Sequence, residues 1–336
     1  MSKVKIAITG FGRIGRCAAR LISDMEDVEL VAVNDTTERE MTKYLLKYDS
    51  VHGTFDKDVE ILEDDYMMIG DMKVKFLNDR DPKNLDFAKY GAEVLLECTG
   101  VFYTQEKSQV YLDNGIKKVI FSAPAKDKET ATFVMGVNED SYQGETIISN
   151  ASCTTNCLAP VVKVIDDAFG IEQGLVTTIH SYTNDQNILD VKHKKDPRRA
   201  RAAAVNMIPT TTGAAKAIGL VLPHLKGKLN GQAVRVPTPN VSMVDLNVMV
   251  KKDTSKDEVN EVFKNAQNKM PNIILVDEDK RVSSDFIGCD ISSIVASDLT
   301  QVIGGNFVKV MAWYDNEWGY SKRLIDLAVH VNNYKG

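Results

Sequence analysis

Cys153 has the sequence setting of a reactive thiol. It lies in the segment Ser149–Asn156, between a short apolar strand expected at residues 146–149 and a helix expected at residues 153–169. Free N–H groups and the macrodipole at a helix N-terminus favour negative charge, and the thiolate is the reactive form of cysteine. We therefore expect a lowered pKa and nucleophilic chemistry at Cys153. The alternative is a buried structural cysteine, the commoner role of a lone cysteine.

A glycine motif near the N-terminus predicts a dinucleotide site. Gly10, Gly12 and Gly15 follow an apolar, β-branched run at residues 4–8 and precede a helix expected to reach residue 24. A second strand, at residues 28–33, leads to Asp35, which lies 20 residues after Gly15. Such glycines permit a tight turn and close approach to a pyrophosphate, and an acid at this spacing binds the ribose hydroxyls.

The order of the other elements predicts two kinds of sheet. Short apolar runs, typical of buried parallel strands, lie at residues 94–97, 118–121, 133–135 and 146–149, with a hairpin at 66–76. Longer runs that alternate apolar and polar residues lie at 174–183, 232–236 and 241–251, and helices are expected at 210–222, 255–268 and 321–333. We expect an α/β fold with a doubly wound parallel sheet, followed by an α+β domain with a mainly antiparallel sheet.

Length and composition limit the classes of function. A chain of 336 residues is too long for one ordinary core, which favours two domains. The net charge of −6 gives no support to nucleic-acid binding, and no apolar run is long enough to span a membrane. The five cysteines form no zinc-type pair, so no metal is expected. Reduced thiols and the absence of a secretory signal predict a cytoplasmic location.

Further polar residues are candidates for catalysis and anion binding. His180 ends an apolar strand, and a histidine beside a cysteine can act as its base, although a structural histidine is the commoner case. The basic segment 192–201 is either a solvated loop or a phosphate site. Residues 210–213, Thr-Thr-Thr-Gly, precede an expected helix N-terminus, and Arg235 follows a strand. Two anion sites near one thiol are indicated.

The chain resembles the phosphorylating glyceraldehyde-3-phosphate dehydrogenases almost from end to end. The segment 149–157, Ser-Asn-Ala-Ser-Cys-Thr-Thr-Asn-Cys, is highly specific to that family and its close relatives. The other matching segments are 10–16, 47–50, 80–82, 97–100, 180–186, 198–203, 208–216, 235–240 and 313–320. The resemblance implies a Rossmann-type NAD-binding domain at residues 1–151, a catalytic domain at 152–318, and a C-terminal helix at 319–336 that packs back onto the first domain. It also implies a homotetramer.

The resemblance further implies a reaction and a set of site residues. Cys153 would attack the aldehyde of D-glyceraldehyde 3-phosphate with His180 as base, and NAD would oxidise the thiohemiacetal to a thioester. Inorganic phosphate would then release 1,3-bisphosphoglycerate, a step of glycolysis and gluconeogenesis. Thr183 and Arg235 are the implied ligands of the substrate phosphate, with Asp185 supporting them. The implied ligands of the attacking phosphate are Ser152, Thr154, Arg199, Thr212 and Gly213. The implied dinucleotide contacts are Gly10, Gly12, Arg13, Ile14, Gly15, Asp35, Arg80, Ser122 and Asn316.

Some positions depart from the family pattern. Thr9 stands where asparagine is usual, and Val191-Lys192 stands where NAD-specific relatives commonly have Leu-Pro, with one extra residue before Arg198. Asp35 favours NAD, whereas Lys192 leaves some use of NADP open. The alternatives are erythrose-4-phosphate dehydrogenase, disfavoured by the intact segments 181–184 and 212–213, and a secondary role in binding RNA or surfaces through Lys194 and Lys195.

Overall fold

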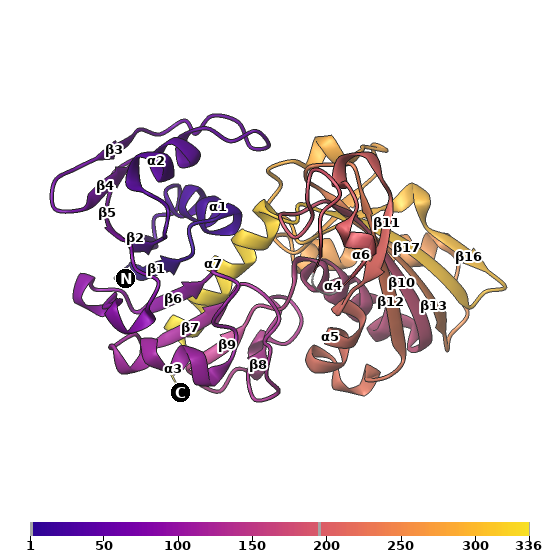
Figure 1. Cartoon of the computed structure of the whole chain (residues 1–336). Coiled ribbons are helices and arrows are strands. Elements are labelled where there is room, and N and C mark those ends of the chain that lie inside the picture. Colours follow the sequence, from indigo (N-terminus) through magenta and orange to yellow (C-terminus); the bar gives the residue numbers. More distant parts are fainter. Residues whose placement is uncertain (1–2, 194–195, 336) are drawn as a thin grey trace. The chain divides into compact units, whose positions relative to one another are not determined.

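The computed structural model describes residues 3–193 and 196–335. The chain divides into two compact units: one contains the described residues up to Ser152 and those from Ser321 onward, and the other runs from Cys153 to Tyr320. Figure 1 gives the helix and strand labels used below. Each unit is built on a sheet of its own.

The first unit contains the predicted parallel sheet. Its strand order is β3-β4-β5-β2-β1-β6-β7-β9-β8, in which β1 pairs in parallel with both β2 and β6. The central strands β1 and β6 are buried at every residue except Lys5, as their mainly apolar sequences predict. The strands are β1 (Val4–Thr9), β2 (Val28–Asn34), β3 (Val59–Ile61), β4 (Tyr66–Ile69), β5 (Met72–Leu77), β6 (Val94–Glu97), β7 (Lys118–Phe121), β8 (Ala131–Thr132) and β9 (Ile147–Ser149).

Helices of the first unit include a segment from the end of the chain. They are α1 (Arg13–Ile22), α2 (Arg39–Lys47), α3 (Gln105–Asp113), the short helices η1 (Pro82–Asn84), η2 (Ala88–Tyr90) and η3 (Glu139–Ser141), and α7 (Trp318–Asn333) from Ser321 onward. Figure 1 shows α7, in yellow, among the indigo and magenta elements of this unit. Ser321 Oγ donates to the carbonyl of Ile14 over 3.4 Å, and His330 Nε2 lies 3.1 Å from the carbonyl of Glu139.

The second unit contains the predicted, mainly antiparallel sheet. Its strand order is β11-β12-β10-β13-β17-β15-β14, with β16 paired to β17. The strands are β10 (Ile171–Ser181), β11 (Ile208–Thr211), β12 (Leu229–Val236), β13 (Ser242–Val250), β14 (Ile274–Asp277), β15 (Ser293–Ala296), β16 (Gln301–Ile303) and β17 (Phe307–Tyr314). The α-helices are α4 (Cys153–Phe169), α5 (Ala214–Val221) and α6 (Lys256–Lys269). The short helices are η4 (Arg198–Ala200), η5 (Ala203–Val205), η6 (Pro223–Leu225), η7 (Ser283–Phe286) and η8 (Ser297–Leu299).

The expected fold class is confirmed, but two local predictions are wrong. Residues 133–135 form no strand; instead the Asn138 side chain binds the backbone on both sides, accepting from Val134 N–H and donating to the carbonyl of Thr132, each over 2.9 Å. The helix expected from residue 210 begins at Ala214, because Thr210 and Thr211 pair with β12 as part of β11. β-branched threonines favour that extended conformation.

Candidate active site and cofactor cavity

A cavity of about 510 Å³ lies in the first unit beside the ends of β1, β2 and β6. This is the edge of a parallel sheet where α/β proteins bind their ligands, and the volume suits a cofactor. Its lining contains four of the nine residues that were expected at the dinucleotide, namely Gly10, Gly12, Asp35 and Arg80. The lining residues are Thr9, Gly10, Gly12, Asn34, Asp35, Thr36, Asp79, Arg80, Leu85, Cys98, Thr99, Val101, Phe102 and Tyr111.

The three glycines of the motif are needed for different physical reasons. Gly10 has φ +86°, and a Cβ there would lie 2.6 Å from the backbone carbonyl carbon of Cys98 and 2.6 Å from the amide nitrogen of Thr99. Only glycine fits at that position. A Cβ on Gly12 would meet no atom within 4 Å, so Gly12 instead keeps the cavity wall open for close approach of a ligand. Gly15 lies buried in the first turn of α1.

Asp35 is held in one orientation at the end of β2. Its Oδ2 accepts from the amide of Phe11 over 2.7 Å, and its Oδ1 accepts from the amide of Thr37 over 2.8 Å. Each carboxylate oxygen keeps a second acceptor position, so the pair of oxygens fits the two hydroxyls of an adenosine ribose. The residues of the cavity therefore suit NAD.

Gly15 and Asn316 do not line this cavity, and neither do three other expected cofactor contacts. The Arg13 guanidinium binds the Asp49 carboxylate with two hydrogen bonds, of 2.5 and 3.1 Å. Burial by itself raises the pKa of Asp49, but hydrogen bonds from the amide of His52, from Arg13 and from the amide of Val51 lower it to about 2. Ile14 and Ser122 are the other two; Ser122 Oγ lies 3.0 Å from Tyr103 Oη.

Cys153 and His180 come together in the second unit. Cys153 begins α4, as predicted, and its Sγ lies 3.4 Å from Nε2 of His180, near the end of β10. His180 is 4% exposed. The turn before Cys153 contains Ala151 at φ +54°, an uncommon backbone conformation for alanine. A thiol and an imidazole nitrogen at this distance are arranged for proton transfer.

The prediction of a lowered pKa at Cys153 is wrong. Burial raises the pKa of the thiol above its ordinary value, and this outweighs the opposing effects of the Arg235 charge and of hydrogen bonds with Thr154. Burial and the Arg235 charge also lower the pKa of His180 to about 3. Burial therefore favours the uncharged form of each group.

Arg235 lies beside His180 because of strand pairing. β10 and β12 run in parallel, and His180 and Arg235 are directly paired positions. Arg235 Nη1 lies 2.8 Å from His180 Nδ1 and donates to the carbonyl of Ser181 over 2.9 Å. Nδ1 of His180 is also 2.7 Å from that same carbonyl oxygen.

A second cation, Arg199, binds Asp185, an expected anion-site residue, and Thr210, which lies two residues before Thr212. Arg199 donates to Asp185 over 2.7 Å and to Thr210 Oγ1 over 2.8 Å. Burial lowers the pKa of Arg235, and the charge of Arg199 acts in the same direction. Thr212 and Gly213 follow β11 at the start of α5, and Thr212 Oγ1 accepts from the amide of Ala214. Thr183 follows β10 and is half-buried, as is Ser152 just before α4.

The site contains a buried hydroxyl network that sequence reasoning missed. Tyr314 Oη lies 2.8 Å from Thr154 Oγ1 and 2.9 Å from Thr178 Oγ1, and its ring packs edge-to-face against His180 with centroids 6.0 Å apart. Thr154 follows Cys153 and Thr178 precedes His180 by two residues. Tyr314 thus fixes the elements that carry both reacting groups. The matching segment 313–320 contained this tyrosine, but no spacing rule connects it to residues 136 and 160 positions away.

Asn316 is oriented by two serines of the second unit. Its Oδ1 accepts from Ser181 Oγ and from Ser242 Oγ, each over 2.8 Å. Ser242 follows Val241, which has φ +65°, a rare conformation for a β-branched residue. With the oxygen engaged, the amide nitrogen of Asn316 is the group left to bind a carboxamide oxygen.

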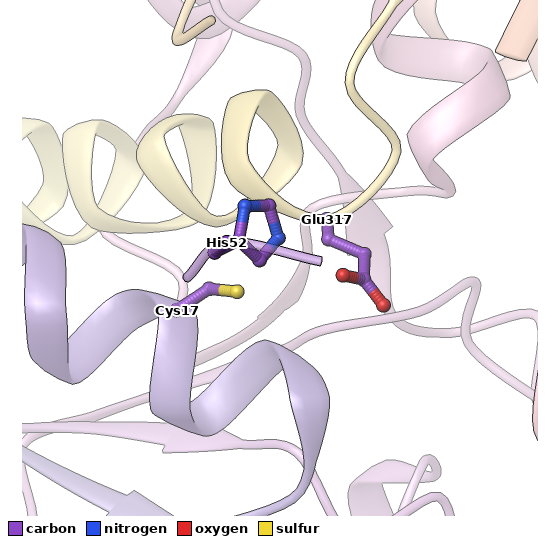
Figure 2. A group of neighbouring side chains, drawn as sticks. All are labelled: Cys17, His52 and Glu317. Atoms are coloured by element: carbon purple, nitrogen blue, oxygen red, sulfur yellow. The ribbon is translucent and has the colours of Figure 1, made fainter. Parts of the chain in front are cut away.

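Another pair of chemistry-bearing side chains lies in the first unit, outside the cavity lining. Cys17 of α1 and His52, which follows α2, have potential ligand atoms within 4.8 Å of each other (Figure 2). Two side chains are fewer than the three or four that a protein zinc site uses. Glu317, also drawn there, belongs to the second unit. We assign no metal to this pair.

Two positions that depart from the family pattern lie on the surface. Val191 and Lys192, which bear on the choice between NAD and NADP, are exposed. Lys194 and Lys195, the candidates for RNA binding, lie outside the described residues. Within the described ranges, no helix has the length and apolar character needed to cross a membrane.

Comparison with known proteins matches segments of both units to the same protein family. Residues 4–105 match the family "Glyceraldehyde 3-phosphate dehydrogenase, NAD binding domain", and residues 152–316 match "Glyceraldehyde 3-phosphate dehydrogenase, C-terminal domain". The chain is 52% identical to glyceraldehyde-3-phosphate dehydrogenase 1 of Bacillus cereus over 332 residues, 98% of each chain. It is 53% identical to glyceraldehyde-3-phosphate dehydrogenase 2 of Nostoc sp. over 331 residues, 97% of each chain.

A chloroplastic relative is similarly close. Over 340 residues the chain is 50% identical to glyceraldehyde-3-phosphate dehydrogenase A, chloroplastic, of Zea mays, covering 99% of this chain and 84% of that protein. The expected enzyme class and cofactor are confirmed: the chain belongs to the glyceraldehyde-3-phosphate dehydrogenase family and is an NAD-dependent dehydrogenase.

Proposed function

We propose that the protein oxidises D-glyceraldehyde 3-phosphate with NAD and inorganic phosphate to 1,3-bisphosphoglycerate, in glycolysis and gluconeogenesis. The observation that carries this proposal is the constellation of Cys153, His180 and Arg235, which combines a nucleophile, a base and a cation for the substrate phosphate within hydrogen-bonding reach. Family membership supports the same substrate. The second cation, Arg199, supports a separate site for inorganic phosphate.

The proposed first step is attack on the aldehyde. The Cys153 thiol transfers its proton to Nε2 of His180, and its sulfur forms a bond to the aldehyde carbon to give a thiohemiacetal. The His180 imidazolium then stabilises the oxygen of that adduct by hydrogen bonding. Arg235 and Thr183 hold the substrate phosphate, which fixes the position of the aldehyde carbon relative to the sulfur.

The proposed later steps convert the adduct to product. NAD, when bound, supplies the hydride acceptor that turns the thiohemiacetal into a thioester. The residues proposed for the dinucleotide are those of the cavity around Asp35, together with Asn316 for the nicotinamide carboxamide. Inorganic phosphate, held by Arg199, Thr212, Gly213, Ser152 and Thr154, then attacks the thioester carbon. The Cys153 thiolate leaves and recovers its proton from His180.

The choice of cofactor follows from Asp35. A carboxylate at the ribose repels the additional phosphate of NADP, which supports NAD as the main cofactor. Exposed Lys192 is the reason to propose a minor use of NADP. The reaction also requires a reduced Cys153, and this supports a location in the reducing cytoplasm.

We propose a homotetramer because one face of the second sheet lacks a cover among the described residues. Helices α4, α5 and α6 pack on one face, while residues of β13 and β17 alternate between buried and half-exposed. The half-exposed face presents apolar side chains, among them Leu175 at 65% exposure and Phe307 at 38%. Apolar patches of this kind are typical of subunit interfaces. Sedimentation equilibrium at assay concentration would test the assembly.

The function is tested by steady-state rates with glyceraldehyde 3-phosphate or erythrose 4-phosphate, with NAD or NADP, and with or without phosphate. We expect the highest kcat/KM with the triose, NAD and phosphate together. Cys153→Ala should abolish oxidation, whereas Cys157→Ala, which removes a buried sulfur one helical turn further along α4, should retain it. Full oxidation by Cys153→Ala would contradict the mechanism. A higher kcat/KM with erythrose 4-phosphate would establish the alternative substrate.

A further inference from the structure

A buried carboxyl group ends a chain of hydrogen-bonded side chains in the first unit. Glu97, the last residue of β6, is 0% exposed. Its Oε1 accepts two hydrogen bonds from Thr99, one from the amide over 2.7 Å and one from the hydroxyl. Its Oε2 lies 3.1 Å from Tyr111 Oη, and Tyr111 is also hydrogen-bonded to the hydroxyl of Thr9. Thr9 Oγ1 in turn accepts from Asn34 Nδ2 over 3.2 Å, which makes the chain continuous.

This chain of side chains forms part of the wall of the cofactor cavity. The lining residues of the cavity include four of its members: Thr9, Asn34, Thr99 and Tyr111. Glu97 itself does not line the cavity. Glu97 can therefore act on a bound cofactor only through those four residues or through its charge.

When Glu97 is ionised, the hydroxyl hydrogens of the chain point toward it. A carboxylate is an acceptor only, so Tyr111 donates to Oε2 and Thr9 donates to Tyr111. The Thr9 hydroxyl hydrogen is then used inside the chain, and one of its lone pairs accepts from Asn34. In this state Thr9 presents only a lone pair to the cavity.

When Glu97 is protonated, the hydrogen bonds between Glu97 and Thr9 reverse. Oε1 already accepts two hydrogen bonds, so the acid proton belongs on Oε2, beside Tyr111 Oη. Buried polar hydrogens are nearly always paired, so Oε2–H donates to Tyr111 and Tyr111 donates to Thr9. The Thr9 hydroxyl hydrogen then needs an acceptor in the cavity. The protonation of Glu97 thus turns Thr9 into a donor toward a bound ligand.

Glu97 changes its protonation state near neutral pH, unlike the ionisable groups around it. Burial raises the pKa of Glu97 to about 7, and its hydrogen bonds and the charge of Lys126 act in the opposite direction. Burial also raises the pKa of Cys98 to about 12 and raises those of Tyr103 and Tyr111. Of these neighbours, none gains or loses a proton in the range where Glu97 does.

We propose that Glu97 is a positioning residue of the cofactor site: it takes up a proton when NAD binds, and Thr9 then donates a hydrogen bond to the cofactor. This inference rests on the proposed placement of NAD in the cavity around Asp35. Thr9 directly precedes the glycine turn, where a pyrophosphate binds, and phosphate oxygens are acceptors only. The proton comes from solvent and adds to Oε2, while Tyr111 and Thr9 only rotate their hydroxyl groups.

The expected size of the effect follows from linkage. One net hydrogen bond corresponds to about a fivefold change in affinity. Coupling is reciprocal, so binding of NAD favours protonated Glu97 by the same factor. With a pKa of about 7 in the free protein, the Kd for NAD should rise about fivefold from pH 6 to pH 9. About 0.4 proton should be taken up for each NAD bound near pH 7.4.

Isothermal titration calorimetry measures both quantities. NAD is titrated into the protein at pH 7.4 in HEPES and in imidazole, whose different ionisation enthalpies reveal the number of protons taken up. Glu97→Gln should bind NAD without proton uptake and with a constant Kd from pH 6 to pH 9, because its amide nitrogen donates to Tyr111 as the acid does. Absence of uptake in the unmodified protein, or undiminished uptake in Glu97→Gln, would overturn the proposal.

Thr9→Val tests the hydroxyl relay separately from the charge of Glu97. Valine has the shape of threonine and suits the end of a strand, while the carboxyl group of Glu97 stays in place. We expect proton uptake to fall to less than half of its value in the unmodified protein. Uptake equal to that of the unmodified protein would refute the relay.

A matched control separates this effect from a general loss of acidic groups. Glu93→Gln removes the carboxylate just before β6, which forms a partly exposed ion pair with Lys117, and should leave proton uptake unchanged. The inference and the proposed NAD site can also fail separately. Unchanged NAD affinity in Asp35→Ala would refute the placement of NAD in this cavity. Weaker binding in Asp35→Ala, with no proton uptake by the unmodified protein, would refute only the inference.

Discussion

Glu97 makes the stability of the first unit depend on pH. It ends β6 with a side chain that is 0% exposed. Its Oε1 accepts from the amide of Thr99 over 2.7 Å and from the Thr99 hydroxyl, and its Oε2 accepts from Tyr111 Oη over 3.1 Å. Burial is the dominant effect and raises the pKa from 4.5 to about 7, against the hydrogen bonds and the charge of Lys126.

The sign and size of the effect follow from proton linkage. Between pH 4.5 and about 7 the folded protein retains a proton on Glu97 that the unfolded chain has lost, so stability falls as pH rises through this window. The stabilisation that comes from the proton on Glu97 is fully present below pH 4.5 and is lost above pH 7. The difference in pKa corresponds to about 3 kcal/mol, at about 1.4 kcal/mol for each pKa unit.

The perturbation is Glu97→Gln, which keeps an acceptor for Thr99 and cannot ionise. We expect the variant and the unmodified protein to have similar free energies of unfolding at pH 5, and the variant to be more stable by about 1–3 kcal/mol at pH 8. Urea unfolding at several pH values and one protein concentration measures this difference. The control is Glu93→Gln, whose partly exposed ion pair with Lys117 is worth about 1 kcal/mol or less. A difference that stays constant from pH 5 to pH 8 would refute the reasoning.

Two further predictions concern the hydroxyl network and the cofactor cavity. Tyr314→Phe removes two buried hydrogen bonds and should lower the free energy of unfolding in urea by about 2 kcal/mol. Tyr142→Phe, which removes one bond to the backbone of Glu145, is the control and should cost about half as much; equal losses would argue against the network. Asp35→Ala should raise the KM for NAD by about tenfold, consistent with loss of a charged hydrogen bond, and should lower the KM for NADP. Steady-state titration of both cofactors measures this, and an unchanged KM for NAD would remove Asp35 from the ribose site.

Local sequence was sufficient wherever one strong pattern determined the structure. The start of α4 at Cys153, the glycine turn after β1 and the hairpin of β4 and β5 all agree with prediction. The failures arose where a side chain competes with the backbone pattern. Asn138 binds the backbone of Val134 and Thr132, and Thr210 joins a sheet edge rather than a helix.

The candidate site was predicted by residue type, but its electrostatics were not. The helix N-terminus suggested a lowered pKa for Cys153, whereas the extent of burial that raises it depends on packing from distant segments. Tyr314 contacts Thr154 across 160 positions of the chain, and no local pattern reports such a contact. The contact between His180 and Arg235 depends on the register between β10 and β12.

That register limits how the family can diversify its substrates. The proton acceptor and the guanidinium occupy facing positions on neighbouring strands, whose separation of about 4.8 Å is a property of the peptide backbone. Evolution can replace either side chain, but it cannot move one relative to the other without shifting every residue of the sheet. A descendant enzyme for uncharged aldehydes would therefore inherit the spacing and would have to replace the arginine where it stands.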